Sequence, residues 1–181
     1  MAARREATVD DLYRVEGKAE IVDGELVLMS AASGLHGYAS GIIYASLLEY
    51  ARRTRHGYAL PDNVGFVVNL SRRRSFSPDA AFTLAALTEK FVDGAPIFAV
   101  EVRSVEDYGP TAERAMARKR ADYFSAGTLV VWDVDTLEGE AVRVFRASDP
   151  SNPVVFTRCD TAEAEPAVPG WSMSVADLFP E

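Results

Sequence analysis

Cysteine, apolar runs of membrane length and positive charge are all scarce in this 181-residue chain. The single cysteine, Cys159, excludes an internal disulfide and any zinc site built from several cysteines. No apolar run approaches the length that spans a bilayer, and residues 1–5 lead into a polar segment without a secretory apolar region. These absences predict a cytoplasmic protein that has no contact with a membrane.

Basic residues are outnumbered, with 19 Lys and Arg against 27 Asp and Glu and a net charge of −8. This balance disfavours a general affinity for nucleic acid. The distribution is uneven, however, because residues 52–74 carry six arginines and one acid, Asp62. A local basic surface on an acidic protein is compatible with phosphate contact, although a solvated surface explains such a cluster equally well.

The length suits one domain with a substantial core, and nothing in the sequence divides residues 1–181. Thr8, followed by acids in the next turn, predicts the start of a short helix. The turn Asp23-Gly24 between apolar segments predicts a β-hairpin. Residues 33–55 follow helical periodicity, so we expect the longest helix there.

Alternating or continuous apolar residues predict strands over residues 58–70, 76–82, 97–102 and 128–134. The segment 111–126 between the last two strands has helical periodicity. A strand, a helix and a strand at this spacing predict a βαβ crossover with parallel strands.

The remainder of the chain predicts a strand near residues 142–145, a turn at 149–153, an edge strand over 154–158 and a short helix near 174–179. The fold class predicted from these elements is α/β. We expect a mixed sheet flanked by helices, with a hairpin and meander early in the chain and one parallel crossover late.

Each of two apolar strands carries one acid on an inward face. Glu101 shares its face with Ala99 and Arg103, and Asp79 shares its face with small residues. Lys119 lies in the middle of an otherwise apolar stripe of the 111–126 helix. The other members of that stripe are Ala112, Ala115, Met116, Tyr123 and Ala126. A buried charge is costly unless it is paired, so we expect these three charged residues to face one another.

Paired carboxylates on rigid strands suit Mg²⁺ or Mn²⁺, which take oxygen ligands and keep waters for a phosphate substrate. Lys119 could then orient the attacking water or neutralise the phosphate, and Arg103 could hold a phosphate as a fixed donor. Without the metal, Asp79 and Glu101 would repel each other.

These residues carry a resemblance to a known family. Ser77-Pro78-Asp79 followed by Glu101-Val102-Arg103 resembles the PD-(D/E)XK nuclease signature with the lysine missing from its usual place. The chain resembles in particular the bacterial Uma-two family of restriction endonucleases, over roughly residues 8–178. The matching stretches are residues 20–27, 77–79, 100–102, 119–127, 132–135 and 168–171.

The resemblance implies a restriction-endonuclease-like fold, a mixed central sheet flanked by helices. It also implies that the catalytic lysine has moved to the following helix, at Lys119, and it makes Glu20 a candidate third metal ligand. Arg103 departs from the broader signature, because it stands where that signature has lysine.

Each site residue also has a purely structural interpretation. Asp79 could be a strand-end acid, Glu101 could pair with Arg103 or Lys119, and Lys119 could extend from its apolar stripe to solvent. Glu20 could simply end a strand. His36 is a surface or capping histidine more often than a ligand.

We therefore predict a Mg²⁺-dependent phosphodiesterase, a DNA endonuclease that uses Asp79, Glu101 and Lys119. Contacts with the nucleic acid are expected from Arg103 and from Arg72, Arg73 and Arg74. Duplex cleavage requires two sites, so a homodimer is expected. The alternative is a nuclease-fold module that binds or assembles without cleaving.

Overall fold

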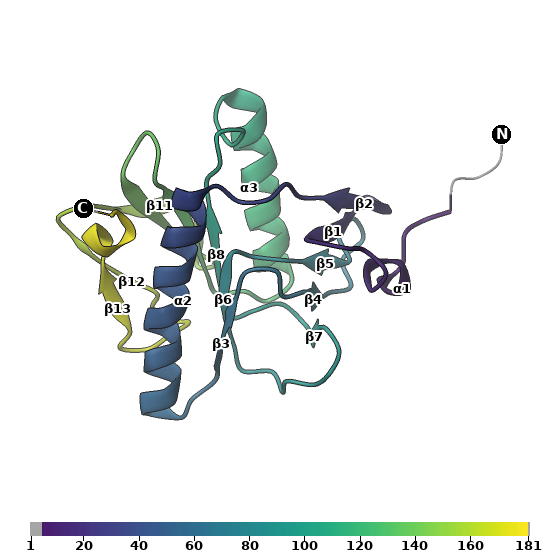
Figure 1. Ribbon diagram of the computed structural model, residues 1–181, viewed down its shortest axis with the longest axis horizontal. Helices are drawn as coiled ribbons and strands as arrows, with labels where there is room; N and C mark the ends of the chain where they lie inside the picture. Colours follow the sequence, from purple (N-terminus) through teal and green to yellow (C-terminus); the bar gives the residue numbers. More distant parts are fainter. Residues whose placement is uncertain (1–4, 181) are drawn as a thin grey trace.

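The computed structural model describes residues 5–180, so most of the segment predicted to lack a secretory region lies outside the described residues. A six-stranded sheet in the order β11-β10-β9-β8-β6-β3 forms its centre (Figure 1). Its strands are Tyr58–Pro61 (β3), Ala80–Thr83 (β6), Phe98–Val102 (β8), Val130–Asp135 (β9), Ala141–Arg146 (β10) and Asp149–Thr157 (β11). Only the β8–β9 pair is parallel within this sheet, so the prediction of a mixed α/β fold is confirmed.

Two helices cover opposite faces of the sheet. The helix α2 (Gly34–Thr54) buries Ile43 and Leu47 against one face, and α3 (Pro110–Ser125) buries Tyr123 against the other. Along β8, Phe98, Val100 and Val102 join the α2 side, whereas Ala99 joins the α3 side. Glu101 therefore faces α3, as strand alternation predicted.

The predicted crossover is confirmed. The chain passes from β8 through α3 to β9, and the parallel register places Glu101 beside Asp133. Gly127 follows α3 with a φ of +107°, a left-handed conformation that glycine adopts without steric cost. The connection therefore reverses tightly and returns the chain to the sheet.

The hairpin is also confirmed, as β1 (Ala19–Val22) and β2 (Glu25–Leu28). It is preceded by the short helix α1 (Val9–Leu12), which Thr8 caps. The Asp23 amide donates to the Arg72 carbonyl at 2.6 Å, and the Arg74 amide donates to the Ile21 carbonyl at 3.0 Å. These bonds fasten the hairpin to the segment that leads to Asp79.

The single strand predicted over residues 58–70 is wrong. The chain turns after β3, with Asn63 at a φ of +64°, and then forms β4 (Phe66–Val67). This strand belongs to a separate three-stranded sheet, β5-β4-β7, with β5 at Ser75–Phe76 and β7 at Val92–Asp93. Asp62 and Asn63 form a turn directly after Pro61, and their local preference overrides the apolar alternation.

The C-terminal predictions need similar corrections. Residues 149–153 do not form the predicted turn, because they begin the edge strand β11, where Pro150 and Pro153 lie in an irregularity of the pairing with β10. A second small sheet was missed, formed by β12 (Thr161–Glu163) and β13 (Ser172–Ser174). The predicted final helix is present as a short 3-10 helix, η1 (Val175–Leu178). This segment packs on the α2 side of the sheet, where Trp171 lies against Trp132.

Candidate active site

Asp79 and Glu101 approach each other at one end of the central sheet. Ala80 of β6 pairs with Val100 of β8, so the two acids lie one position beyond this pair on adjacent strands. The Asp79 amide donates to the Val100 carbonyl at 2.9 Å, and Asp79 Oδ2 accepts from the Val102 amide at 2.7 Å. These backbone contacts fix the Asp79 carboxylate against β8.

Lys119 of α3 reaches the same place. Its Nζ lies 2.8 Å from Glu101 Oε2 and 2.9 Å from Glu20 Oε1. Tyr123, one helical turn later, donates its hydroxyl to Glu101 Oε1 at 2.6 Å. The inward position predicted for Lys119 is what the structure has, although the stripe itself differs in that Ala115 is exposed.

Asp122 was expected to lie outside the inward stripe, yet it is buried. Its Oδ2 accepts from Arg73 Nε at 2.9 Å. Arg73 also pairs with Glu20 Oε2, and Glu20 Oε1 accepts from the Ser77 amide at 2.9 Å. Glu20 is only 3% exposed, and its two oxygens connect the hairpin to both the Asp79 segment and α3.

Two further site residues were missed by the sequence analysis. Lys18 Nζ lies 2.5 Å from Asp79 Oδ1 and 2.7 Å from Asp62 Oδ1. His36, in the first turn of α2, places Nε2 3.2 Å from Asp79 Oδ1. A signal for Lys18 was present, because it stands two positions before Glu20 and so shares a strand face with it.

The cations around Asp79 determine its charge state. Burial alone would raise the pKa of Asp79, but the hydrogen bond from His36 and the charge of Lys18 hold that pKa well below its usual range. In return, the hydrogen bond to Asp79 raises the pKa of His36. Asp79 is therefore a carboxylate at neutral pH.

Glu101 has the opposite shift. Its burial raises the pKa, and the negative charges of Asp79 and Glu20 add to this effect against the opposing charge of Lys119. For Lys119 itself, burial favours the neutral amine, but Glu101 and Glu20 together raise its pKa. Lys119 is therefore an ammonium ion at neutral pH.

The connected ion pairs leave an excess of negative charge. Five carboxylates are paired mainly by three Lys and Arg side chains. Arg72, whose Nε lies 3.7 Å from Asp122 Oδ2, and His36 beside Asp79 compensate part of the remaining negative charge. The acids are Asp62, Asp79, Glu101, Glu20 and Asp122, and the cations are Lys18, Lys119 and Arg73. We call these eight residues the site network.

Arg103 is not available to a phosphate, which corrects the sequence-based expectation. It is 4% exposed, and its Nε and Nη2 donate to the two carboxylate oxygens of Asp133 at 2.6 and 2.8 Å. Glu113 accepts from the remaining side of the guanidinium. Arg103 therefore anchors the start of α3 to β9.

The three arginines at positions 72–74 differ in their exposure and in their partners. Arg73 is 5% exposed and holds Glu20 and Asp122, so the expectation that it contacts nucleic acid is wrong as well. Arg72 is half-buried and pairs with Asp23 at 3.2 Å. Arg74 is exposed, and its guanidinium donates a hydrogen bond to the side-chain oxygen of Asn69. Arg74 is thus the most accessible cation of this group.

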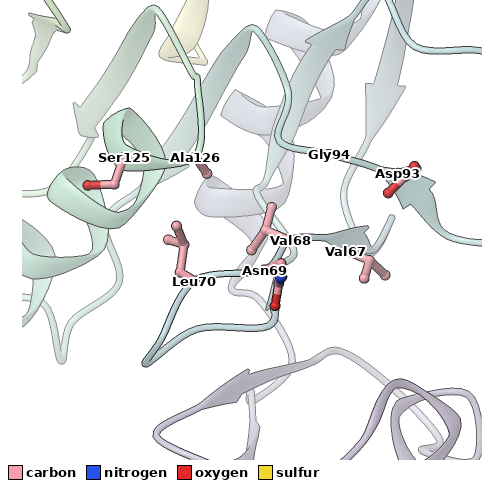
Figure 2. Close-up of a pocket in the computed structure, with 8 residues that line it drawn as sticks. All are labelled: Val67, Val68, Asn69, Leu70, Asp93, Gly94, Ser125 and Ala126. Carbon is pink, nitrogen blue, oxygen red and sulfur yellow. The ribbon is translucent and has the colours of Figure 1, made fainter.

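A cavity of about 360 Å³ lies away from these charges, between the end of α3 and the small sheet. Figure 2 shows its lining, with residues 67–70 and 93–94 facing 125–126. Asp93 is the one ionisable residue among them. This cavity therefore offers no acid–base or charge-stabilising constellation.

Residues 5–180 contain neither a cluster of potential metal ligands nor a helix that could span a membrane. No cluster of three or more His, Cys, Asp or Glu side chains in this range has the arrangement of a metal site. No helix in the same range has the length and hydropathy needed to cross a bilayer.

Comparison with known proteins agrees with the geometry. Residues 8–176 match the family model described as "Uma2: Putative restriction endonuclease". The fold resembles a crystal structure titled as a putative nuclease belonging to DUF820 from Anabaena variabilis ATCC 29413, with a TM-score of 0.73 and 17% identity. That match covers 96% of this chain and 97% of the other. No curated protein matches the sequence. Since the family model spans nearly the whole chain, the protein belongs to the Uma2 family.

Proposed function

We propose that this chain is a divalent-metal-dependent nuclease, in which Asp79 and Glu101 bind Mg²⁺ or Mn²⁺ and Lys119 stabilises charge on the scissile phosphate. One observation carries the proposal. Two acids from adjacent strands and a lysine from the next helix converge at one end of a rigid sheet. Groups held on strands and helices keep the fixed geometry that catalysis requires.

The donor set suits Mg²⁺. This ion binds through one or two carboxylates and keeps waters and substrate phosphates as its other ligands, so a cluster of three acids is not needed. The excess of carboxylates over cations in the site network favours a divalent cation over a neutral ligand. When bound, the ion would stabilise negative charge on the phosphate and lower the pKa of a nucleophilic water.

The charge state of Lys119 limits the roles that this residue can have. Because Glu101 and Glu20 raise its pKa, its amine keeps the proton and cannot serve as a general base at neutral pH. Its ammonium instead donates hydrogen bonds to developing negative charge. Glu20 and Tyr123 position this group indirectly, since they fix Lys119 and Glu101.

Nucleic acid is the proposed substrate because the chain belongs to a family described as restriction endonucleases. DNA and a homodimer are the finer parts of the proposal. A two-fold dimer would place two sites on the two strands of a duplex. Light scattering of the purified chain with and without DNA tests that assembly.

The experiment for the activity is incubation of the purified chain with single- and double-stranded DNA in Mn²⁺, in Mg²⁺ and in EDTA. We expect cleavage that requires metal and disappears in Glu101→Gln. Wild-type protein that binds Mn²⁺ in calorimetric titration but leaves DNA and RNA intact would contradict the proposal.

A second function, a module that binds without cleaving, is favoured by a different observation. Protein cations already pair with Asp79, Glu101 and Glu20, so the fold can satisfy these acids without a metal. Such a module has no reason to bind Mn²⁺. A calorimetric titration without heat of binding in the wild type would support it.

A further inference from the structure

A cavity of about 280 Å³ lies immediately beside the site network. Ser77, in its wall, precedes Asp79 by two residues. Gly17 and Ala19, also in its wall, flank Lys18. The wall of the cavity and the site network therefore share two chain segments, residues 17–19 and 77–79.

One wall of this cavity is a rigid aromatic pair. The rings of Tyr13 and Phe91 stack with centroids 4.1 Å apart and an interplanar angle of 6°. The Phe91 amide donates to the Tyr13 hydroxyl at 2.9 Å. A Cβ at Gly65 would lie 2.6 Å from the Phe91 ring, so glycine is required for this close approach. Stacking covers one face of Tyr13, and the residue is nevertheless 47% exposed.

The remaining lining combines apolar and polar groups. Leu12 and Val15 contribute apolar surface, and Asn63 and Ser77 contribute an amide and a hydroxyl that both donate and accept hydrogen bonds. A nucleobase has matching chemistry, since it presents two apolar π faces and a polar edge. Aromatic side chains bind unpaired bases by stacking, with little dependence on base identity.

We propose that this cavity binds one unpaired nucleobase of the substrate strand, next to the phosphate that lies against Lys18 and Lys119. The inference rests on the proposed function and specifies its substrate as a single-stranded or locally unstacked nucleic acid. The net charge of −8 supports this choice, because an acidic protein gains little from the many phosphates of a long duplex. Contact with a base supplies affinity that does not depend on that charge.

The test is a scan of single abasic sites through a fluorescently labelled single-stranded oligonucleotide, with binding followed by anisotropy in EDTA. For the wild type we expect one position at which base removal weakens binding about tenfold, the scale of one stacking contact. Tyr13→Ala should abolish that position dependence, and Tyr13→Phe should keep it. Tyr58→Ala is the matched control, since Tyr58 is 48% exposed and pairs with Thr83, at the far end of β6 from Asp79.

The scan of the wild type requires no variant, so it stands even if a substitution unfolds the chain. A flat profile, a profile unchanged in Tyr13→Ala, or equal affinity for the matching duplex would each overturn the inference. Cleavage of the same oligonucleotides in Mn²⁺ is scored separately. Cleavage with a flat profile overturns the cavity inference alone, whereas a Tyr13-dependent profile without cleavage overturns the proposed activity alone.

Discussion

Lys119 and Glu101 are 18 residues apart in the chain, yet Nζ of the lysine lies 2.8 Å from Oε2 of the glutamate. Both groups are largely withdrawn from water, which costs free energy that only a well-placed partner offsets. Glu20 supplies a second carboxylate to the ammonium, and Tyr123 donates to the other oxygen of Glu101. This pair therefore joins the hairpin, the central sheet and α3 through the proposed catalytic groups.

Replacement of the two proposed metal ligands by their neutral amides should affect the free energy of unfolding differently. Asp79→Asn removes the charge that Lys18 and His36 face, so we expect the free energy of unfolding in EDTA to fall on the order of 3 kcal/mol. Glu101→Gln removes a carboxylate whose raised pKa shows that its charge is disfavoured, so little or no loss is expected. Urea denaturation at pH 7 measures both. Equal destabilisation by the two substitutions would contradict this assignment of charges.

The expected loss in Asp79→Asn corrects the sequence-based view that the two acids merely repel each other without metal. Repulsion between Asp79 and Glu101 is present, but Lys18 and His36 outweigh it at Asp79. Neither cation could be placed at the site from the sequence, so this balance could not be predicted.

Stability should also depend on pH through Glu101. Its folded-state pKa is raised, so the unfolded chain releases this proton first. The contribution of Glu101 is thus fully present below the unfolded value of about 4.3 and is lost as pH rises through the folded value. In EDTA, the wild type should therefore lose stability relative to Glu101→Gln as pH rises through the range between these two pKa values. The titration of His36 contributes to the stability of both proteins and therefore cancels in their difference. A stability difference that does not change with pH would refute the prediction.

Substitutions of Arg103 and Arg74 should separate a structural arginine from one that contacts nucleic acid. Arg103→Met breaks the buried pair with Asp133 and a second pair with the exposed Glu113, so we expect it to cost about 3–5 kcal/mol of stability. Arg74→Glu changes an exposed side chain, so stability should stay within about 0.5 kcal/mol. Arg74→Glu should nevertheless weaken binding of the labelled oligonucleotide and flatten its salt dependence. An unchanged salt slope would remove Arg74 from the interface.

The convergence of Asp79, Glu101 and Lys119 could be predicted because two short-range periodicities determine it. Strand alternation orients the acids, and helical spacing orients the lysine. The partners Lys18, His36 and Arg73 depend on how the hairpin and α2 dock on the sheet. Lys18 and Asp79 are 61 residues apart, and no local pattern specifies such a distance.

Burial of arginine was the main failure at the site. The sequence suggested contacts with nucleic acid for Arg103 and Arg73, but each finds two carboxylates from other elements. In the fold, the errors fell where turn residues interrupt apolar alternation, as at Asn63, and where an edge strand tolerates proline. Both cases depend on which strand becomes the neighbour, and this information is not local.

The most direct test of the nuclease proposal is the cleavage rate of Lys119→Met at saturating Mn²⁺, compared with the wild type on the same DNA. Methionine keeps much of the apolar stem and removes the ammonium, while Asp79 and Glu101 remain to bind the ion. The account predicts a fall in the cleavage rate of about 10²-fold or more, with little rescue by Lys119→Arg, whose guanidinium has a different shape. Cleavage by Lys119→Met at a rate near that of the wild type would contradict it.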